Sequence, residues 1–276
     1  MLARDKIIRL KDLMRRSLPP NLHRPFVRLS RSVAGWWYRN DLNQLALIFG
    51  TDKWGGHWYT EHYQRYFRPW KHRRLNLLEI GVGGYKDSAA GAESLRMWKA
   101  FFRRGRIVGI DIEDKTRFRE DRIDIRQCDQ TDVEALGRLS DEYGGFDIVI
   151  DDGSHVNEHV IKAFHALFPR LRPNGIYAVE DIQTSYWPTY GGGIGNPRSS
   201  MAFFKSLADG LNHAEFPLEA YRATYLDQNV VEIAFFPNLV LIRKGENATQ
   251  SNPQEISREI RAAKETVTPD TRVVGK

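Results

Sequence analysis

Two acidic clusters in this chain have the residue types and the spacing that metal-assisted chemistry requires. Residues 151–155 read Asp-Asp-Gly-Ser-His and follow an apolar run, and Glu180-Asp181 follows a second apolar run. Short apolar runs of this kind are typical of buried strands. Ligands of an open α/β sheet bind at the carboxyl ends of its strands. We therefore expect Asp152, Glu180 and Asp181 at one rim of a sheet, with His155 beside them.

These side chains predict a magnesium site with a base next to it. Magnesium takes oxygen ligands, often one or two carboxylates together with water, and Asp152, Glu180 and Asp181 could supply three. Asp151 is the poorer ligand, because neighbours in an extended chain point to opposite sides. An imidazole with its ordinary pKa of about 6.5 suits a general base, which favours His155. The alternative is that the acids cap helices or pair with arginine, and the other seven histidines are expected to be structural.

The elements that must position these residues alternate along the chain. Strands alternating with helices indicate a doubly wound, mostly parallel α/β sheet. Two further strands joined across Pro237-Asn238 predict an antiparallel hairpin at the edge of that sheet. The glycine-rich residues 191–197 are either a mobile lid over the strand ends or a surface loop. The expected strands are 76–80, 106–112, 123–127, 146–151, 175–180, 230–236 and 239–243, and the helices between them are about 90–102, 133–143 and 158–171.

Composition and charge indicate a globular protein with a basic arm. The single cysteine, Cys128, excludes an intramolecular disulfide, and no apolar run approaches the ~18 residues of a membrane span. Residues 1–40 hold ten Lys or Arg against two Asp, so this segment alone is more positive than the whole chain with its net charge of +6. A body without net positive charge argues against nucleic acid as a partner. We expect a cytoplasmic protein with a helical arm at 1–40, a domain at 41–245 and a polar tail at 246–276.

The arm has two interpretations. Residues 1–17 alternate basic and apolar positions, and a second basic stretch ends in Trp36-Trp37-Tyr38. A basic amphipathic helix with an aromatic anchor is typical of peripheral membrane contact, here at the inner face of the membrane. The alternative is an arm that packs on its own domain or on a partner subunit of a homo-oligomer.

A glycine turn after the first strand predicts the cofactor. In residues 77–84, Leu-Leu-Glu-Ile-Gly-Val-Gly-Gly, Gly81 and Gly83 match two glycines of a dinucleotide fingerprint, but Lys86 replaces the third. This departure argues against a nicotinamide dehydrogenase. Glu79 lies inside the strand, where an acidic residue is unusual, and could receive a cationic ligand. S-adenosylmethionine is such a ligand, because it carries an ammonium and a sulfonium and has no phosphate.

Further polar residues follow the next two strands. Asp111 ends the second strand, where a carboxylate can bind a ribose diol, and Asp129-Gln130 follows the third, where a nucleoside base would lie. With the glycine turn, this order makes the chain resemble class I S-adenosylmethionine-dependent methyltransferases. The resemblance implies a Rossmann-like, seven-stranded sheet that ends in the antiparallel hairpin. Methyl transfer also gives His155 a task, because a metal-bound hydroxyl becomes a good nucleophile once a base removes its proton.

Residues 45–245 more closely resemble the macrolide-sugar O-methyltransferases, the mycinamicin VI and demethylmacrocin enzymes. The resemblance rests on Asp-Gly-Ser-His at 152–155, on Glu-Asp-Ile-Gln-Thr-Ser-Tyr-Trp at 180–187, and on Gly-Thr-Asp-Lys with His-Trp-Tyr in residues 50–59. It implies a magnesium ion on Asp152, Glu180 and Asp181, with His155 as the base. It also implies that S-adenosylmethionine binds at Tyr59, Glu79, Gly81, Asp111 and Asp129. The glycine turn and the residues after the third strand add Gly83 and Gln130 to this predicted cofactor site.

The expected function is therefore metal-dependent transfer of a methyl group from S-adenosylmethionine to a sugar hydroxyl of a glycosylated lipid, glycan or macrolide. The arm at 1–40 does not resemble the N-terminal region of the mycinamicin enzyme and favours a lipid-linked or cell-envelope acceptor. One alternative acceptor is a catechol or another small vicinal diol, which magnesium chelates equally well. A different class of function is a non-catalytic scaffold with this fold, but a scaffold has no need of His155 together with three carboxylates.

Overall fold

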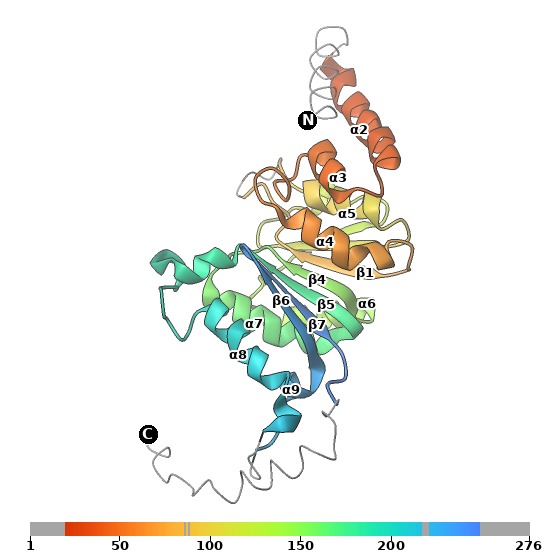
Figure 1. Cartoon of the computed structure of the whole chain (residues 1–276). Helices are drawn as coiled ribbons and strands as arrows, with labels where there is room; N and C mark the ends of the chain where they lie inside the picture. Colours follow the sequence, from red (N-terminus) through yellow and green to blue (C-terminus); the bar gives the residue numbers. More distant parts are fainter. Residues whose placement is uncertain (1–19, 86, 88, 217–220, 249–276) are drawn as a thin grey trace, which may run out of the picture.

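The computed structural model describes residues 20–85, 87, 89–216 and 221–248, and a seven-stranded sheet forms its centre (Figure 1). The strand order is β3-β2-β1-β4-β5-β7-β6. The first five strands along the chain are parallel, and β7 pairs antiparallel with both β5 and β6. The predicted doubly wound sheet with a closing hairpin is confirmed. The strands are β1 (Asn76–Ile80), β2 (Arg106–Asp111), β3 (Ile123–Gln127), β4 (Phe146–Asp151), β5 (Leu171–Glu180), β6 (Val230–Phe236) and β7 (Leu239–Lys244).

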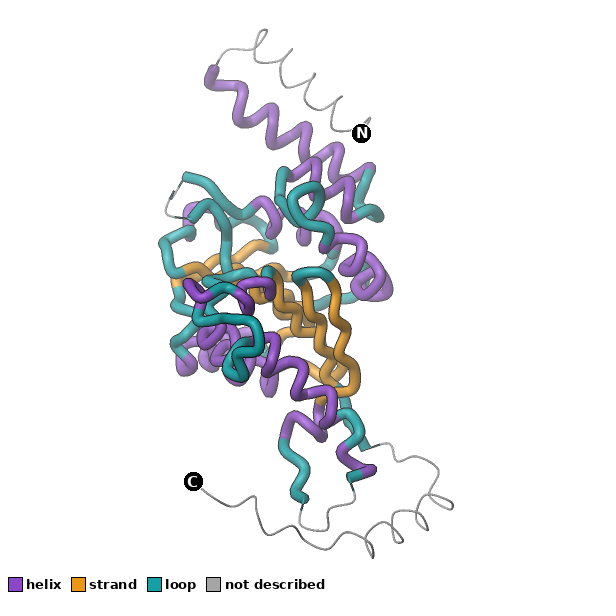
Figure 2. The backbone as a smooth tube through the Cα atoms, turned by 60° about the vertical axis from the view of Figure 1, so that its left-hand side comes forward, coloured by secondary structure: helices purple, strands orange, loops and turns teal. Residues whose placement is uncertain are grey.

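Helices cover both faces of this sheet (Figure 2). Alternate strand residues point to opposite faces, so Leu77 and Ile148 pack in one core whereas Leu78 and Val149 pack in the other. The first core is closed by α3 (Leu42–Phe49), α4 (Tyr59–Phe67) and α5 (Glu93–Phe101). The second is closed by α6 (Val133–Tyr143), α7 (Asn157–Leu167) and α8 (Ser200–Gly210), and the short α9 (Tyr225–Asn229) precedes β6.

Short 3₁₀ helices connect several of these elements. They are η1 (Arg68–Trp70), η2 (Thr116–Phe118), η3 (Phe168–Arg170), η4 (Ile182–Tyr186), η5 (Pro188–Tyr190) and η6 (His213–Glu215). The connection from α7 to β5 differs from the prediction. The helix ends at Leu167 and β5 begins at Leu171 instead of at Gly175. Pro169 in η3 has no backbone N–H for a longer helix, and the freed chain pairs with β4 earlier through an irregular register at Phe146.

Part of the predicted arm packs on the domain. Helix α2 (Pro20–Trp37) extends from the body and contacts α3 and α5 with its C-terminal half (Figure 1). Gly35 is buried there, and a Cβ at this position would lie 3.1 Å from the ring of Phe49. The amphipathic pattern at residues 1–17 and most of the predicted tail lie outside the described residues. Within the described part, no helix is both long and apolar enough to cross a membrane.

The glycine-rich residues 191–197 form a series of turns on η4 and η5. The backbone N–H groups of Gly192 and Gly193 donate to Trp187 and Ser185 at 3.0 and 2.9 Å. The Asn157 side chain also donates to the carbonyl of Tyr190 at 2.8 Å. These bonds attach the start of the loop to the segment that follows Asp181, so the loop lies next to the carboxyl end of β5.

Candidate active site

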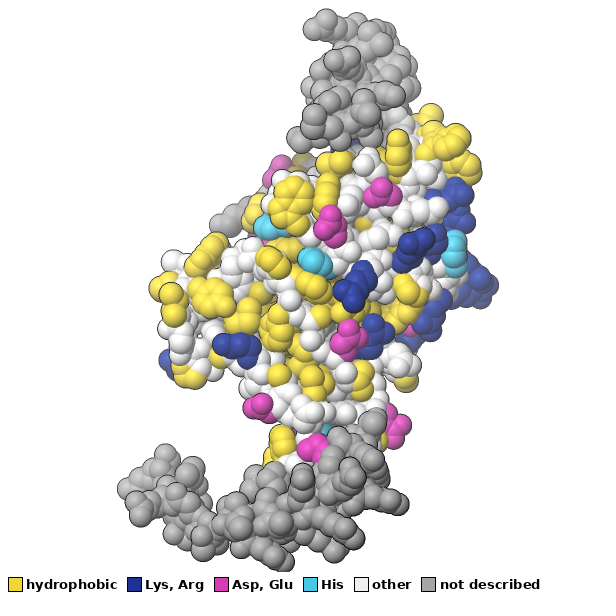
Figure 3. Space-filling model, in the orientation of Figure 1, with side chains coloured by type: hydrophobic (Ala, Val, Ile, Leu, Met, Phe, Trp, Pro, Cys, Tyr) yellow, Lys and Arg dark blue, Asp and Glu magenta, His cyan; other side chains and the backbone are white. Residues whose placement is uncertain are grey.

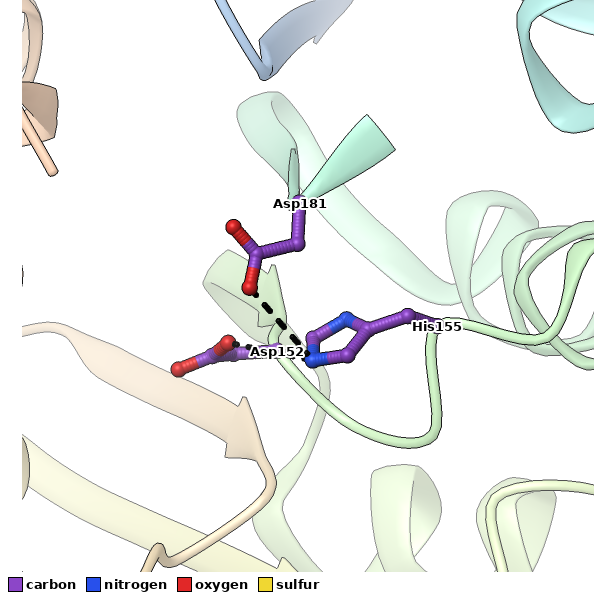
Figure 4. Close-up of side chains that lie close together, drawn as sticks. All are labelled: Asp152, His155 and Asp181. Carbon is purple, nitrogen blue, oxygen red and sulfur yellow. Dashed lines mark ion pairs between the residues drawn. The ribbon is translucent and has the colours of Figure 1, made fainter. Parts of the chain in front are cut away.

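The carboxyl ends of β4 and β5 bring Asp152, His155 and Asp181 together (Figure 4). His155 Nε2 lies 3.6 Å from Asp181 Oδ2 and 3.9 Å from Asp152 Oδ1. One ligand atom from each residue lies within 4.8 Å of the others. All three side chains remain partly exposed, between 19% and 26%. Two carboxylates and an imidazole that converge in this way could hold a divalent cation or share a proton with a bound hydroxyl.

The backbone at this rim is held in an uncommon conformation. His155 has φ of 56° and Asp181 has φ of 50°, both in the left-handed region. This region costs a non-glycine residue about 1–2 kcal/mol, and residues held in it are often found at active sites. The hydroxyl of Thr184 in η4 donates to the carbonyls of His155 and Asp181 at 2.9 and 3.1 Å. One side chain therefore fixes the two loops relative to each other.

Lys53 is the central residue that the sequence reasoning missed. Its side chain is 1% exposed, and its Nζ donates to Asp152 Oδ2 and to Glu180 Oε2, each at 2.7 Å. The same Nζ lies 3.1 Å from Glu79 Oε1. One ammonium thus joins a carboxylate of the glycine-turn strand to two carboxylates of the acidic rim. The sequence signal is the Gly-Thr-Asp-Lys segment at residues 50–53, which carries part of the family resemblance.

The segment around Lys53 supplies a donor to each acid of the rim. Tyr59 donates to Asp181 Oδ1 at 2.6 Å, and Tyr63 donates to Glu180 Oε1 at 2.7 Å, both from the first half of α4. His57 Nδ1 lies 3.6 Å from Asp181 Oδ1, and its ring stacks on that of Tyr59. His57 was placed among the structural histidines by the sequence, yet it borders the site. Tyr59, predicted at the edge of the cofactor, also contacts Asp181, and its role at the cofactor stays a prediction.

Three carboxyl groups surround the single ammonium of Lys53 in this cluster. Burial raises the pKa of Glu180 well above its ordinary value, and the charge of Asp152 adds to this while Lys53 opposes it. Burial also raises the pKa of Glu79. Burial alone would lower the pKa of Lys53, but the charges of Asp152, Glu180 and Glu79 raise it well above the ordinary value. One ammonium faces three carboxyl groups whose ionised forms repel one another, so a cation bound at the rim would favour those ionised forms.

The two acids that follow β5 have different surroundings. Both oxygens of Glu180 accept hydrogen bonds from buried donors, and the residue is 3% exposed. Asp181 is more open, and although burial would raise its pKa, the hydrogen bond from Tyr59 and the nearby His155 lower it. Asp152 and Asp181 therefore present free oxygens to the rim. Glu180 lies one layer deeper, and its predicted role as a metal ligand stays a prediction.

Asp151 points away from the rim, as strand alternation predicts. It is 1% exposed and lies 3.3 Å from the hydroxyl of Tyr177 and 3.5 Å from the amide of Gln130. Burial raises its pKa to about 7. Gln130, predicted to bind the cofactor, uses its amide oxygen to accept the N–H of Ser154 at 2.6 Å. Its side chain thus holds the loop that carries His155.

The glycine turn after β1 lies directly beside this loop. Gly81 has φ of 92°, and a Cβ there would be 2.1 Å from the carbonyl oxygen of Asp152. Gly83 has φ of 81°, and at both positions such a conformation favours glycine. Asp111 accepts the N–H of Val82 at 2.8 Å and so braces the turn from β2. Gly81, Gly83 and Asp111 therefore lie together at the same end of the sheet as the acidic rim.

The other two predicted cofactor residues differ in accessibility. Asp129 is exposed after β3, where its carboxylate accepts the N–H and the hydroxyl of Thr131 at 2.7 and 2.8 Å. Glu79 is fully buried, and its Oε2 accepts the indole N–H of Trp98 and the hydroxyl of Ser94, each at 3.0 Å. With Lys53 on the other oxygen, Glu79 is enclosed by protein groups. The sequence shows that Glu79 is an unusual residue for a strand, but it does not reveal these hydrogen-bond and ion-pair partners.

Comparisons with known proteins agree with this arrangement. A family model described as a methyltransferase domain matches residues 42–182. The chain is 52% identical over 206 residues to 8-demethyl-8-alpha-L-rhamnosyl tetracenomycin-C 2'-O-methyltransferase of Streptomyces olivaceus. It is 48% identical over 227 residues to demethylmacrocin O-methyltransferase of Streptomyces fradiae. These matches cover 74% and 80% of this chain but only 54% and 58% of the relatives.

A solved structure of similar fold holds magnesium and SAH, the demethylated form of the expected cofactor. This structure is the MycE methyltransferase from the mycinamycin biosynthetic pathway in complex with Mg, SAH and mycinamycin VI. It has a TM-score of 0.76 and 44% identity to this chain, with 82% of this chain and 59% of the other covered. The shared fold and sequence therefore extend over most of the described domain, and the match spans a little more than half of each relative's length.

Proposed function

The chain belongs to the methyltransferase family, and we propose that it transfers a methyl group from S-adenosylmethionine to a sugar hydroxyl with the help of a magnesium ion. The observation that carries this proposal is the convergence of His155, Asp152 and Asp181 beside the glycine turn of β1. A nucleophile bound at the acidic rim would face a methyl donor bound over that turn. Holding both reactants in line supplies a large part of the rate of such a displacement.

His155 is the group that removes the proton from the acceptor hydroxyl. Its Nε2 faces the rim between the free oxygens of Asp152 and Asp181. The negative charge of Asp181, 3.6 Å away, stabilises the imidazolium that forms. The backbone contact from Thr184 fixes the loop that aims the ring. Magnesium at this rim would lower the pKa of a hydroxyl that it contacts, and the open oxygens of Asp152 and Asp181, with Glu180 behind them, fit such a hard cation.

The cofactor fits the edge formed by β1 and β2. The turn at Gly81 and Gly83 has no side chains, so a ligand can approach its backbone closely. Asp111 stands at the end of β2, where it could bind a ribose, and Asp129 is exposed after β3. We assign Glu79, Gln130 and Tyr59 to the support of this site, because each is buried and bound to other protein groups.

The acceptor that we propose is a small glycoside with an apolar aglycone. The relatives are named for a rhamnosyl tetracenomycin and for demethylmacrocin, both glycosylated compounds. In this chain Tyr186, Trp187 and Ile194 follow Asp181 and are 46%, 48% and 94% exposed. Apolar side chains this open beside a polar rim are suited to an apolar ring system while the sugar reaches the rim. A lipid-linked glycan would meet the same requirement.

The remaining sequence predictions stay proposals. We propose a methyltransferase domain at 41–245 between an arm and a tail, assembly into a homo-oligomer, and a cytoplasmic location with peripheral membrane contact. Each relative is much longer than its match to this chain.

The test of the proposed function is methyl transfer from labelled S-adenosylmethionine to a panel of rhamnosides, macrolide glycosides and catechols, with products identified by mass spectrometry. We expect a monomethylated glycoside, loss of activity in EDTA and its return with magnesium.

His155→Ala should lower kcat about 10²- to 10⁴-fold, the usual contribution of a general base, while SAH affinity by calorimetry stays within a few fold. His159→Ala is the matched control, because His159 contacts Ser154 and none of the rim acids. Full activity in EDTA, full turnover by the His155 variant, or methylation of catechols alone would contradict the proposal.

A further inference from the structure

Cationic side chains gather at the end of the sheet opposite the active site. They come from η1 and the segment before β1, from the turn between α5 and β2, and from the first residues of β2 and β5. All these positions are at the amino ends of the parallel strands, whereas the acidic rim is at the carboxyl ends. The basic face, as we call it, consists of Arg68, Lys71, Arg73, Arg74, Arg103, Arg104, Arg106 and Arg172.

These charges lie close to one another. Arg74, Arg104, Arg106 and Arg172 line an open hollow of about 480 Å³ together with Leu75 and Asn76. Lys71 lies beside it, and its backbone carbonyl accepts the N–H of Arg103 at 3.3 Å. Burial lowers the pKa of Lys71, and the neighbouring charges of Arg68, Arg103 and Arg39 lower it further. Like charges held this close repel one another, so the arrangement does not stabilise the fold.

Few acids balance the basic face. Among the described residues, Arg172 is the one member with a carboxylate partner, Asp147 at 2.9 Å. The other seven have no described carboxylate within 4.0 Å. Figure 3 shows Lys and Arg side chains gathered along the right-hand edge of the molecule. The body is not basic overall, so this is a local concentration of charge that attracts an anionic partner.

An apolar stripe on α2 adjoins the basic face. Leu29, Val33, Trp36 and Trp37 recur at helical spacing and are 63%, 52%, 58% and 72% exposed. The opposite side of the helix, with Gly35, packs on the domain. The helix therefore presents large apolar side chains to the outside although its inner side is already covered. The two indole rings contact edge to face, with centroids 5.3 Å apart.

Residues 36–40 join the stripe to the basic face. The Arg39 guanidinium lies over the ring of Trp36, 4.4 Å from its centroid, and donates to the Trp36 carbonyl at 3.1 Å. Lys71 Nζ donates to the Asn40 side chain at 2.5 Å. The indoles, Arg39 and the basic face thus form one continuous surface. Indoles beside guanidinium groups are typical of side chains that lie at the boundary between lipid and water.

We propose that this surface binds the anionic headgroup layer of a lipid bilayer, with Trp36 and Trp37 entering the interface and the basic face pairing with lipid phosphates. An amphipathic stripe supplies the apolar area and the arginines supply the electrostatic attraction, and stable peripheral binding needs two such signals. A second copy of the chain fits less well, because a symmetric contact would bring the same arginines of both copies together. The proposal does not depend on the methyl-transfer chemistry. It leaves the rim of Asp152 and Asp181 on the side away from the bilayer.

Vesicle flotation with the full chain tests the proposal. We expect binding to phosphatidylcholine vesicles that contain phosphatidylglycerol, little binding without it, and loss of binding at high salt. Arg74→Gln with Arg104→Gln should lower the partition coefficient about thirtyfold, since each basic residue contributes about 1 kcal/mol near an anionic surface. Trp36→Ser with Trp37→Ser should lower it at least about tenfold through lost apolar burial. The control, Arg138→Gln with Lys205→Gln, removes the same charge from exposed positions on α6 and α8 and should bind as wild type.

Several outcomes would overturn the proposal. Equal binding of the wild type to neutral and anionic vesicles would exclude this surface as the lipid contact. Wild-type binding by both the arginine variant and the tryptophan variant would exclude it as well. A change in molar mass by light scattering in the Trp36 and Trp37 variant would identify the stripe as an interface between copies. Binding of a single-stranded oligonucleotide through the same arginines, with no binding of vesicles, would assign the face to nucleic acid. Methyl transfer to a water-soluble glycoside should be unchanged in all variants, which separates a failure here from a failure of the proposed function.

Discussion

Lys53 is the residue on which the geometry of the site depends most. Its ammonium has three carboxylate oxygens within 3.1 Å and almost no contact with solvent. By holding Oδ2 of Asp152, it leaves Oδ1 facing His155. By holding Oε2 of Glu180, it keeps that acid behind Asp181. A buried lysine is ordinarily unfavourable, so its role here is to let mutually repelling acids be placed side by side.

Lys53→Met should therefore destabilise the protein. Removing one partner of a buried ion pair leaves uncompensated charge and typically costs about 3–5 kcal/mol. We expect a lower midpoint of urea unfolding, measured by circular dichroism in buffer without divalent cations. Lys53→Arg should recover part of the loss because it restores the charge, and Lys162→Met, at an exposed position, should have little effect. Unchanged stability of the Lys53→Met variant would show that the cluster relaxes by binding protons or water and does not need the ammonium.

At the level of elements, the site is formed where loops from β1, β4 and β5 meet. Gly81 follows β1 and packs on the carbonyl of Asp152, and Gln130 after β3 holds Ser154 of the same loop. Thr184 of η4 then attaches the His155 loop to the end of β5. Each connection uses a backbone group on at least one side. The loops therefore depend on the packing of neighbouring strand ends more than on their own sequences.

This arrangement explains how much the sequence could predict. Asp152, His155 and Asp181 could be brought together in advance, because the ends of adjacent parallel strands meet at one edge. The place of Lys53 could not be predicted, because it is 99 residues from Asp152 and 127 residues from Glu180 along the chain. Its burial follows from how the segment between α3 and α4 packs. The sequence shows that Glu79 is an acid in a strand, but its contact with Trp98 crosses from β1 to α5 and leaves no local pattern.

Gly81→Ala should disrupt the site by displacing the loop after β4. An added Cβ would lie 2.1 Å from a backbone oxygen that cannot move independently of β4. We expect a loss of about 1–3 kcal/mol in the free energy of unfolding and a marked loss of SAH affinity by calorimetry. Gly55→Ala is a close control, because Gly55 has the same φ of 92° but no atom within 4 Å of the added methyl. If both variants behaved alike, backbone strain and not the contact with Asp152 would be the cause.

On the scale of the whole molecule, charge is separated along the strands of the sheet. The carboxyl ends collect the acids around Lys53, and the amino ends collect the arginines of the basic face. The net charge of the body does not show this division, because the two ends offset each other. A field of this kind draws cations and anionic surfaces to opposite ends of the protein. If the basic face binds an anionic surface, as proposed, the acidic rim stays open to ligands.

The excess of acids at one end predicts that divalent cations stabilise the folded protein. A ligand that binds only the native state raises its stability by about 2.7 kcal/mol at a hundredfold excess over Kd. For a domain of this size that corresponds to a rise in Tm of about 5–10 °C. We expect magnesium to give such a rise by scanning calorimetry, and the combined variant Asp152→Asn and Asp181→Asn to lose it. Asp209→Asn, at an exposed position on α8, should keep the full shift. An equal rise in Tm in the Asp152 and Asp181 variant would place the cation elsewhere on the surface. If magnesium did not raise the Tm of the wild type, the acidic rim would not bind the ion and the prediction would be wrong.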